Sequence, residues 1–224
     1  MSDATHDPRL NRVLREAATP GLMTALAERL APTDLQTLLL EVSRRRALLH
    51  EDARSRRRVR LGSIHRVIRA QAFSGPGMTA HFKLLALCTA GRDEGSFDFE
   101  AQTLTEHIHL LLDVLERSRR VGRTRVTITD LAEQRRTALR TRVLEPLSQG
   151  HPGTAFGFDQ ERTTGRGYYT GACFEVHANG PDGELNIADG GFTTWTADLL
   201  SNAKERLLIS GLGIERLCGL FPSG

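Results

Sequence analysis

The segment that decides the fold is Arg206-Leu-Leu-Ile-Ser-Gly-Leu-Gly-Ile-Glu-Arg-Leu217. An apolar run meets two glycines, Gly211 and Gly213, and a helix-forming stretch then begins with the pair Glu215-Arg216. The pattern predicts a strand that ends in a glycine turn and a helix that follows at once. Glycine lets the backbone approach a ligand closely, and an arginine in the first helical turn offers a planar fork of donors to a phosphate. Alone, the pattern also fits a turn with a solvated arginine.

Size and composition indicate one main domain. The 224 residues can bury a substantial core, and 30 lysines and arginines against 27 acidic residues leave a net charge of only +3. The arginines cluster within residues 44–60 and 117–125, where they could contact phosphates. These clusters lack the interleaved aromatic side chains that stack on bases. We therefore favour solvated surfaces over a nucleic-acid interface.

The sequence carries no export or membrane signal. Its polar, acidic N-terminus argues against a signal peptide, and no apolar stretch is long enough to span a bilayer. Cys88, Cys173 and Cys218 are far apart and each lies in an apolar run, which favours reduced core thiols. We therefore expect a cytoplasmic protein.

Three parts follow one another along the chain. Residues 1–48 form an N-terminal helical arm, with a helical pattern over 9–48, residues 49–60 form a charged connector, and residues 61–224 form the core. In the arm, the residues at i, i+3, i+4 and i+7 make one apolar stripe: Leu35, Leu38, Leu39 and Val42. An exposed stripe of this kind would suit a homodimer.

The core alternates strand and helix patterns. We expect strands at 61–69, 81–90, 126–129, 154–158, 168–177 and 184–189, and a strand followed by a helix within 206–221. Helix remains an alternative for 81–90. We expect helices at 104–115, from a Thr129 cap to about Leu147, and at 195–205. Glycine turns dominate the second half, so we predict an α+β fold with a largely antiparallel sheet flanked by helices.

Four segments carry the candidate binding residues. They are Arg69-Ala-Gln71 followed by His81-Phe82-Lys83-Leu84, then 165–175, then Asp189-Gly190-Gly191-Phe192, and finally 206–217. In this order they resemble the catalytic core of class II aminoacyl-tRNA synthetases, and most closely the histidyl-tRNA synthetase group. That group carries Arg-x-Glu, Phe-His-Gln-Leu, Tyr-Tyr-Thr-x-x-x-Phe-Glu, Gly-Gly and Gly-x-Gly-x-Glu-Arg-Leu. The resemblance covers about residues 61–221.

The resemblance implies an ATP site with Mg²⁺ that adenylates a carboxylic acid. Adenylation needs positive charge around the phosphates, which two arginines can supply without proton chemistry. Arg69 would contact the α-phosphate and the substrate carboxylate, and Arg216 the γ-phosphate side. Phe82, or its neighbour His81, would stack on adenine, and Gln71 would accept a hydrogen bond from the adenine amino group.

The resemblance also implies an amino-acid pocket. Arg166, Tyr168 and Tyr169 would line it, while Gly190, Gly191, Gly211 and Gly213 would keep its floor open. Lys83 and Leu87 stand where the family has polar residues that bind the amino group and the imidazole. Neither side chain accepts a hydrogen bond from an amine or an imidazole N–H.

Other features of a tRNA synthetase are missing. The dimer-building first signature is not recognisable, and the Thr-Glu loop that holds the substrate amino group has no counterpart. The sequence ends soon after the third signature, so we expect no anticodon-binding domain of the usual ~100 residues. These departures argue against a working tRNA synthetase.

Two function classes remain. The first is a stand-alone enzyme that adenylates an amino acid or related carboxylic acid. The second is a non-catalytic regulatory paralogue that acts through a partner protein, as some relatives of the histidyl group do. We reject a metal site at His107-x-His109, because this spacing does not place both rings on one helical face. Glu175 and Asp189 could form a carboxylate pair, although no sequence feature brings them together.

Overall fold

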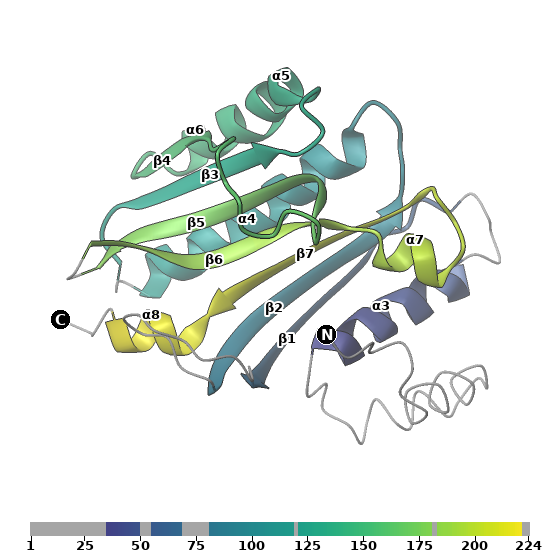
Figure 1. The fold of residues 1–224 in the computed structure, drawn as a ribbon, viewed down its shortest axis with the longest axis horizontal. Helices are drawn as coiled ribbons and strands as arrows, with labels where there is room; N and C mark the ends of the chain where they lie inside the picture. The colour runs from purple at the N-terminus through teal and green to yellow at the C-terminus, as the bar shows by residue number, and fades with distance from the viewer. Residues whose placement is uncertain (1–34, 50–54, 69–80, 119–120, 181–182, 221–224) are drawn as a thin grey trace. The chain divides into compact units, whose positions relative to one another are not determined.

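A seven-stranded sheet organises the described part of the chain (Figure 1). The structure is a computed structural model, and it describes residues 35–49, 55–68, 81–118, 121–180 and 183–220. Across the sheet the strands are β1 (Val59–Ile68), β2 (His81–Arg92), β7 (Glu205–Gly213), β6 (Gly183–Thr193), β5 (Thr170–Gly180), β3 (Thr124–Asp130) and β4 (Thr154–Phe158). Neighbouring strands are antiparallel, except that β3 and β4 are parallel. The predicted α+β fold is confirmed, and residues 81–90 are strand rather than helix.

Among the described helices, one precedes the first strand, one follows the last, and the others lie between strands in the sequence. They are α3 (Leu35–Leu48), α4 (Asp98–Ser118), α5 (Arg136–Leu139), the π-helical turn η3 (Arg140–Leu144), α6 (Glu145–Gly150), α7 (Trp195–Leu199) and α8 (Ile214–Leu220). No helix within these described ranges has the length and apolar character needed to cross a membrane.

Helix α4 covers one face of the sheet, which we call the α4 face. Five of its apolar residues follow one another at helical spacing, and all are buried: Leu104, Ile108, Leu111, Leu112 and Leu115. They share a core with alternate residues of the central strands, among them Leu87 of β2, Phe174 of β5 and Leu208 of β7. Because side chains alternate along a strand, the neighbouring residues face the other way.

Helix α3 covers part of the opposite face, which we call the α3 face (Figure 1). Its stripe residues Leu38, Leu39 and Val42 are buried in a second core with Cys88 of β2 and Ile209 of β7, among others. These three residues of the stripe that would suit a homodimer are therefore covered by the chain's own sheet. Their burial removes them from the surface that a second copy could contact.

A buried ion pair fixes α3 to the sheet. The guanidinium of Arg46 donates two hydrogen bonds of 2.9 Å to the carboxylate of Glu205, and the two side chains are 1% and 0% exposed. Several arginines of the clusters are paired in the same way, at lower burial. Arg58 binds Glu94, Arg60 binds Glu106 and Arg125 binds Glu184. These arginines are thus engaged by acidic side chains of the same chain.

Two local expectations change in the structure. Thr129 lies inside β3 and donates to the carbonyl of Asp159, so it does not cap the next helix. Instead, the backbone N–H groups of Ala132 and Arg135 donate hydrogen bonds to the buried carboxylate of Asp130. The first strand of the core, expected from residue 61, begins at Val59. Residues 9–34, including the first part of the helical arm, lie outside the described residues.

A buried histidine joins α4 to strands β2 and β7. His107 Nε2 lies 2.8 Å from the hydroxyl of Thr89 on β2, and its Nδ1 lies 2.9 Å from the hydroxyl of Ser210 on β7. Hydroxyls can donate and accept, so they satisfy both nitrogens of a neutral ring. Burial lowers the pKa of His107 to about 4. The ring is therefore neutral near pH 7.

We predict that this histidine makes folding stability depend on pH between about 6.5 and 4. In that window the unfolded chain binds the proton that the folded chain excludes, so stability falls as the pH falls, by up to ~3 kcal/mol. Urea unfolding of the wild type and of His107→Gln at several pH values measures this slope. The variant should lose less stability than the wild type over the same interval, and equal slopes would contradict the assignment.

Candidate ligand site on the α3 face

An arginine between two carboxylates forms the centre of the candidate site. The β5–β6 register places Glu175 directly opposite Asp189. Arg162, from the loop before β5, forms an ion pair with Asp189, and its Nε lies 3.5 Å from Glu175 Oε1. The Arg162 side chain is only 4% exposed, whereas that of Asp189 is 36% exposed. Asp189 thus presents the accessible edge of this cluster.

Tyr169 completes the cluster. Its hydroxyl donates to the carboxylate of Asp189, and its ring centroid lies 5.7 Å from the guanidinium carbon of Arg162. Tyr168 packs edge-on against it at 5.0 Å and is 44% exposed. The turn that delivers both tyrosines contains Gly165, whose φ of +74° is a left-handed conformation that favours glycine. The sequence motif therefore corresponds to a precise local structure.

Burial and the neighbouring charges together set the protonation of Arg162 and Tyr169. Burial lowers the pKa of the Arg162 guanidinium, but Asp189 and then Glu175 among its neighbours outweigh this effect, so the pKa is raised overall. Burial, followed by the charge of Asp189, raises the pKa of the Tyr169 phenol. At neutral pH Arg162 is a cation and Tyr169 keeps its proton. The cluster then holds one cation for two carboxylates.

Arg162 has an unsatisfied buried donor. Among the described residues, its Nη1 has no hydrogen-bond partner. Buried polar groups normally have one. The sequence offered only a weak signal for Arg162, an arginine three residues before the glycines of the Tyr-Tyr motif, and the site prediction did not include it.

The β7–α8 turn lies next to this cluster. Gly211 is the register partner of Asp189, and Gly213 ends β7 before α8 begins. The Cβ of Arg216 is 3.6 Å from the place where a Cβ on Gly213 would stand. Arg216 Nη1 donates to the carbonyl of Asn186 at 2.6 Å. This contact ties the first turn of α8 to β6.

Strand alternation sorts the predicted site residues into two groups. Phe82, in step with Leu84, belongs to the α3 face, as do Gly191, Gly211 and Gly213. Lys83 and Leu87 are in step with Leu85 on the α4 face, where Leu87 is a core residue. The structure therefore does not bring Lys83 or Leu87 to the same face as Tyr169.

The predicted glycine floor is largely filled by protein side chains. A Cβ on Gly191 would lie 2.5 Å from Tyr169, and one on Gly211 would lie 2.8 Å from Leu84. Gly190 faces the other way, where a Cβ would lie 2.6 Å from both Phe174 and Ser210. Close packing, rather than open space, explains why these three positions need glycine.

One other predicted residue has a clear placement, and two do not. Arg166 donates to the carbonyls of Arg162 and Gln160, so it braces the loop that carries the cluster. Arg69 and Gln71 lie outside the described residues. The predicted convergence of Arg69 with Arg216 therefore remains a prediction.

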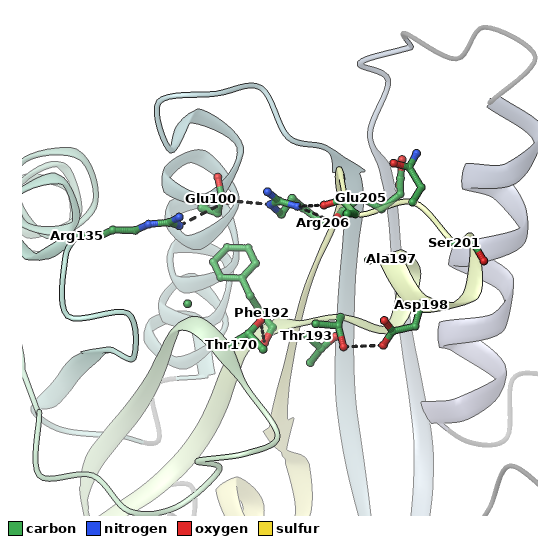
Figure 2. A pocket seen from close by; sticks show the side chains of 14 residues that line it. Glu100, Arg135, Thr170, Phe192, Thr193, Ala197, Asp198, Ser201, Glu205 and Arg206 are labelled. Carbon is green, nitrogen blue, oxygen red and sulfur yellow. Dashed lines mark hydrogen bonds and ion pairs between the residues drawn. The ribbon is translucent and has the colours of Figure 1, made fainter.

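A hollow lies at the other end of β7. It has a volume of about 710 Å³ and is lined by 14 residues from α4, α7, β5, β6, β7 and neighbouring loops, which Figure 2 draws as sticks. Arg206 donates to Glu100 at 3.1 Å and to Asp93 at 2.6 Å, and Arg135 lies 3.8 Å from Glu100. The cations that Figure 2 shows there already meet acidic side chains. None of the predicted site residues that the structure describes lines this hollow, although Thr170, Gly171, Phe192 and Arg206 of the four candidate segments do.

Comparison with known proteins shows the class of fold. No protein-family model matches the sequence, and no curated protein matches it. Solved structures do match, and they assign the chain the α+β fold of class II aminoacyl-tRNA synthetases. Apo S. aureus histidyl-tRNA synthetase aligns at 17% identity with a TM-score of 0.53, over 77% of this chain and 46% of that one.

Two further structures match over larger shares of their own length. An ATP phosphoribosyltransferase regulatory subunit/histidyl-tRNA synthetase from Bacillus halodurans aligns at 15% identity and a TM-score of 0.56, over 86% of this chain and 67% of that one. A histidine–tRNA ligase subunit from Alicyclobacillus acidocaldarius aligns at 15% identity and a TM-score of 0.54, over 82% of this chain and 74% of that one. This chain therefore spans about half to three quarters of these structures. At such identities the likeness concerns the fold.

The packing of Tyr169 over Gly191 generates a second prediction. In Gly191→Ala the new Cβ would overlap the Tyr169 ring and the Cβ of Cys173, so the variant should lose about 1–3 kcal/mol of stability. Gly153→Ala is the matched control, because a Cβ there would meet no atom within 4 Å. Thermal unfolding of the two variants compares them. Equal melting temperatures would show that the ring does not occupy this space.

Proposed function

We propose that this protein binds ATP with Mg²⁺ and an amino acid or related carboxylic acid on the α3 face, and adenylates that acid without being a true tRNA synthetase. One observation carries the proposal. Phe82, which the resemblance assigns to adenine, shares a sheet face with the Arg162–Asp189–Tyr169 cluster, as do Gly211 and Gly213, which it places at the floor of the amino-acid pocket. A scattered arrangement would have left no common surface for two substrates.

The charges on this face suit two different ligand groups. The carboxylates of Asp189 and Glu175 outnumber Arg162, so this end favours a cation such as a substrate ammonium group. Arg216 stands at the other end, beside Gly213, where it favours an anion such as a phosphate or carboxylate. An amino acid and a nucleotide together offer this pattern of charge.

The catalytic demand on the protein is electrostatic. Attack of a carboxylate on the α-phosphate of ATP places extra negative charge on the phosphate oxygens and releases pyrophosphate. Arg216, with Arg69 and Mg²⁺ in the roles that the resemblance implies, would stabilise that charge. Arg162 would act differently: it neutralises Asp189 and Glu175 in part and holds them in place.

We predict ATP–pyrophosphate exchange that depends on one member of a panel of amino acids and related acids. Arg216→Ala should lower the exchange rate at least tenfold, because it removes a cation from the reacting phosphates. Arg117→Ala, at the exposed end of α4, is the control and should keep the wild-type rate. Absence of exchange with every acid, together with absence of ATP binding by calorimetry, would refute the proposal.

A regulatory role is the second candidate, and one observation favours it. Lys83 and Leu87 lie on the α4 face, and side chains fill the space over Gly191 and Gly211, so the amino-acid-reading positions of the resemblance are not reproduced. One structure of similar fold is named in part as a regulatory subunit of ATP phosphoribosyltransferase. A protein of this type would bind a ligand and a partner protein without turnover.

The two candidates predict opposite results in a paired experiment. A regulatory protein should form a stable complex with a partner in a pull-down and show no ATP consumption. An adenylating enzyme should consume ATP with its acid substrate when no partner is present. ATP consumption by the purified chain without a captured partner would exclude the regulatory reading.

A further inference from the structure

One side of helix α4 carries polar residues that face α6. His109, Asp113 and Glu116 follow each other at i, i+4 and i+7, so they lie along one side of the helix. His151, just after α6, meets this side. His109 Nδ1 lies 2.7 Å from His151 Nε2, and His109 Nε2 lies 3.8 Å from Asp113 Oδ2.

Glu116 orients the ring of His151. The carboxylate lies 2.7 Å from His151 Nδ1, and the His151 side chain is only 2% exposed. A carboxylate accepts the Nδ1 proton, which leaves the lone pair of Nε2 directed at His109. Histidines that bind metals are commonly held by a carboxylate on the opposite nitrogen in this way.

We propose that His109, Asp113 and His151 bind a divalent late first-row metal ion, of which Zn²⁺ is the one to test. One ligand atom from each residue lies within 4.8 Å of the other two. The ion would take the place of the proton between the two imidazoles, and Glu116 would hold His151 in its binding orientation. Two imidazoles and a carboxylate leave one tetrahedral position for water.

The two imidazoles need only a small adjustment, and Asp113, whose Oδ2 lies 3.8 Å from Nε2 of His109, must turn toward Nδ1 of that ring. Two nitrogens on one tetrahedral Zn²⁺, each at about 2.0–2.1 Å, are separated by about 3.3 Å. The present nitrogen–nitrogen separation is 2.7 Å. His109 is 56% exposed and can move outward, while buried His151 stays in place. The nitrogen ligands disfavour Mg²⁺ and Ca²⁺, which bind oxygen.

This inference does not depend on the adenylation proposal. The cluster lies between α4 and α6, on the side of the sheet opposite the Asp189 cluster. The rings of His107 and His109 point in different directions, as their spacing predicts. His107 contacts Ser210 of the sheet, whereas His109 contacts His151 after α6. The informative spacing is His109-Leu-Leu-Leu-Asp113, which becomes a site only when the fold adds His151.

Calorimetric titration of the untagged full chain with Zn²⁺, after treatment with a chelator, tests the site. The wild type should bind one equivalent. His109→Ala and Asp113→Asn should each weaken binding at least tenfold, and Glu116→Gln should weaken it about 10–100-fold through loss of the orienting carboxylate. Glu106→Gln is the matched control on the same helix, because Glu106 pairs with Arg60; it should bind like the wild type.

Folding must be separated from binding in these variants. His109 is exposed, and alanine is a strong helix former, so His109→Ala should keep the wild-type circular dichroism spectrum. Co²⁺ should give visible absorption bands in the wild type that His109→Ala lacks. The site is refuted if the wild type binds no Zn²⁺, or if folded His109→Ala binds it with unchanged affinity.

Discussion

The burial of one sheet face beneath α4 is the constraint on which the rest of the structure depends. Ten α4 residues are buried there, and His107 extends this contact into the sheet through Thr89 and Ser210. Strand alternation then leaves only every second residue of the central strands available on the opposite face. Phe82, Tyr169, Asp189 and Gly211 share that opposite face, whereas Leu87 lies beneath α4.

On that opposite face, Arg162 has a structural task that precedes any binding. Two carboxylates at adjoining register positions would repel each other if no cation lay between them. Arg162 is buried, contacts both, and supports the ring of Tyr169. Loss of one partner from such a cluster leaves an uncompensated buried charge, which is costly. The cluster therefore behaves as one unit: it holds Asp189 at the accessible edge while keeping Glu175 largely enclosed.

The sequence predicted those features that depend on local pattern. The period of Leu104, Ile108 and Leu111 identified α4, and the run from Arg206 to Gly213 identified β7 and the start of α8. It could not predict features that depend on distant pairing. Arg162 meets Asp189 across 27 positions and His109 meets His151 across 42. The sheet face on which Lys83 lies follows from the register of β2, which no local motif specifies. Thr129 is a strand residue rather than a helix cap, because β3 extends through it to Asp130.

Arrangement of charge, more than likeness of fold, distinguishes the functions open to this chain. A synthetase-like sheet can support many tasks, and a fold does not fix its chemistry. Here an acidic cluster on β5 and β6 adjoins a glycine turn that carries Arg216, and both are fixed by the same β6 strand. A ligand with separated positive and negative groups would satisfy both ends, whereas a purely anionic ligand would face Asp189 unfavourably. For the α3 face we therefore propose an amino acid beside a nucleotide rather than a nucleotide alone.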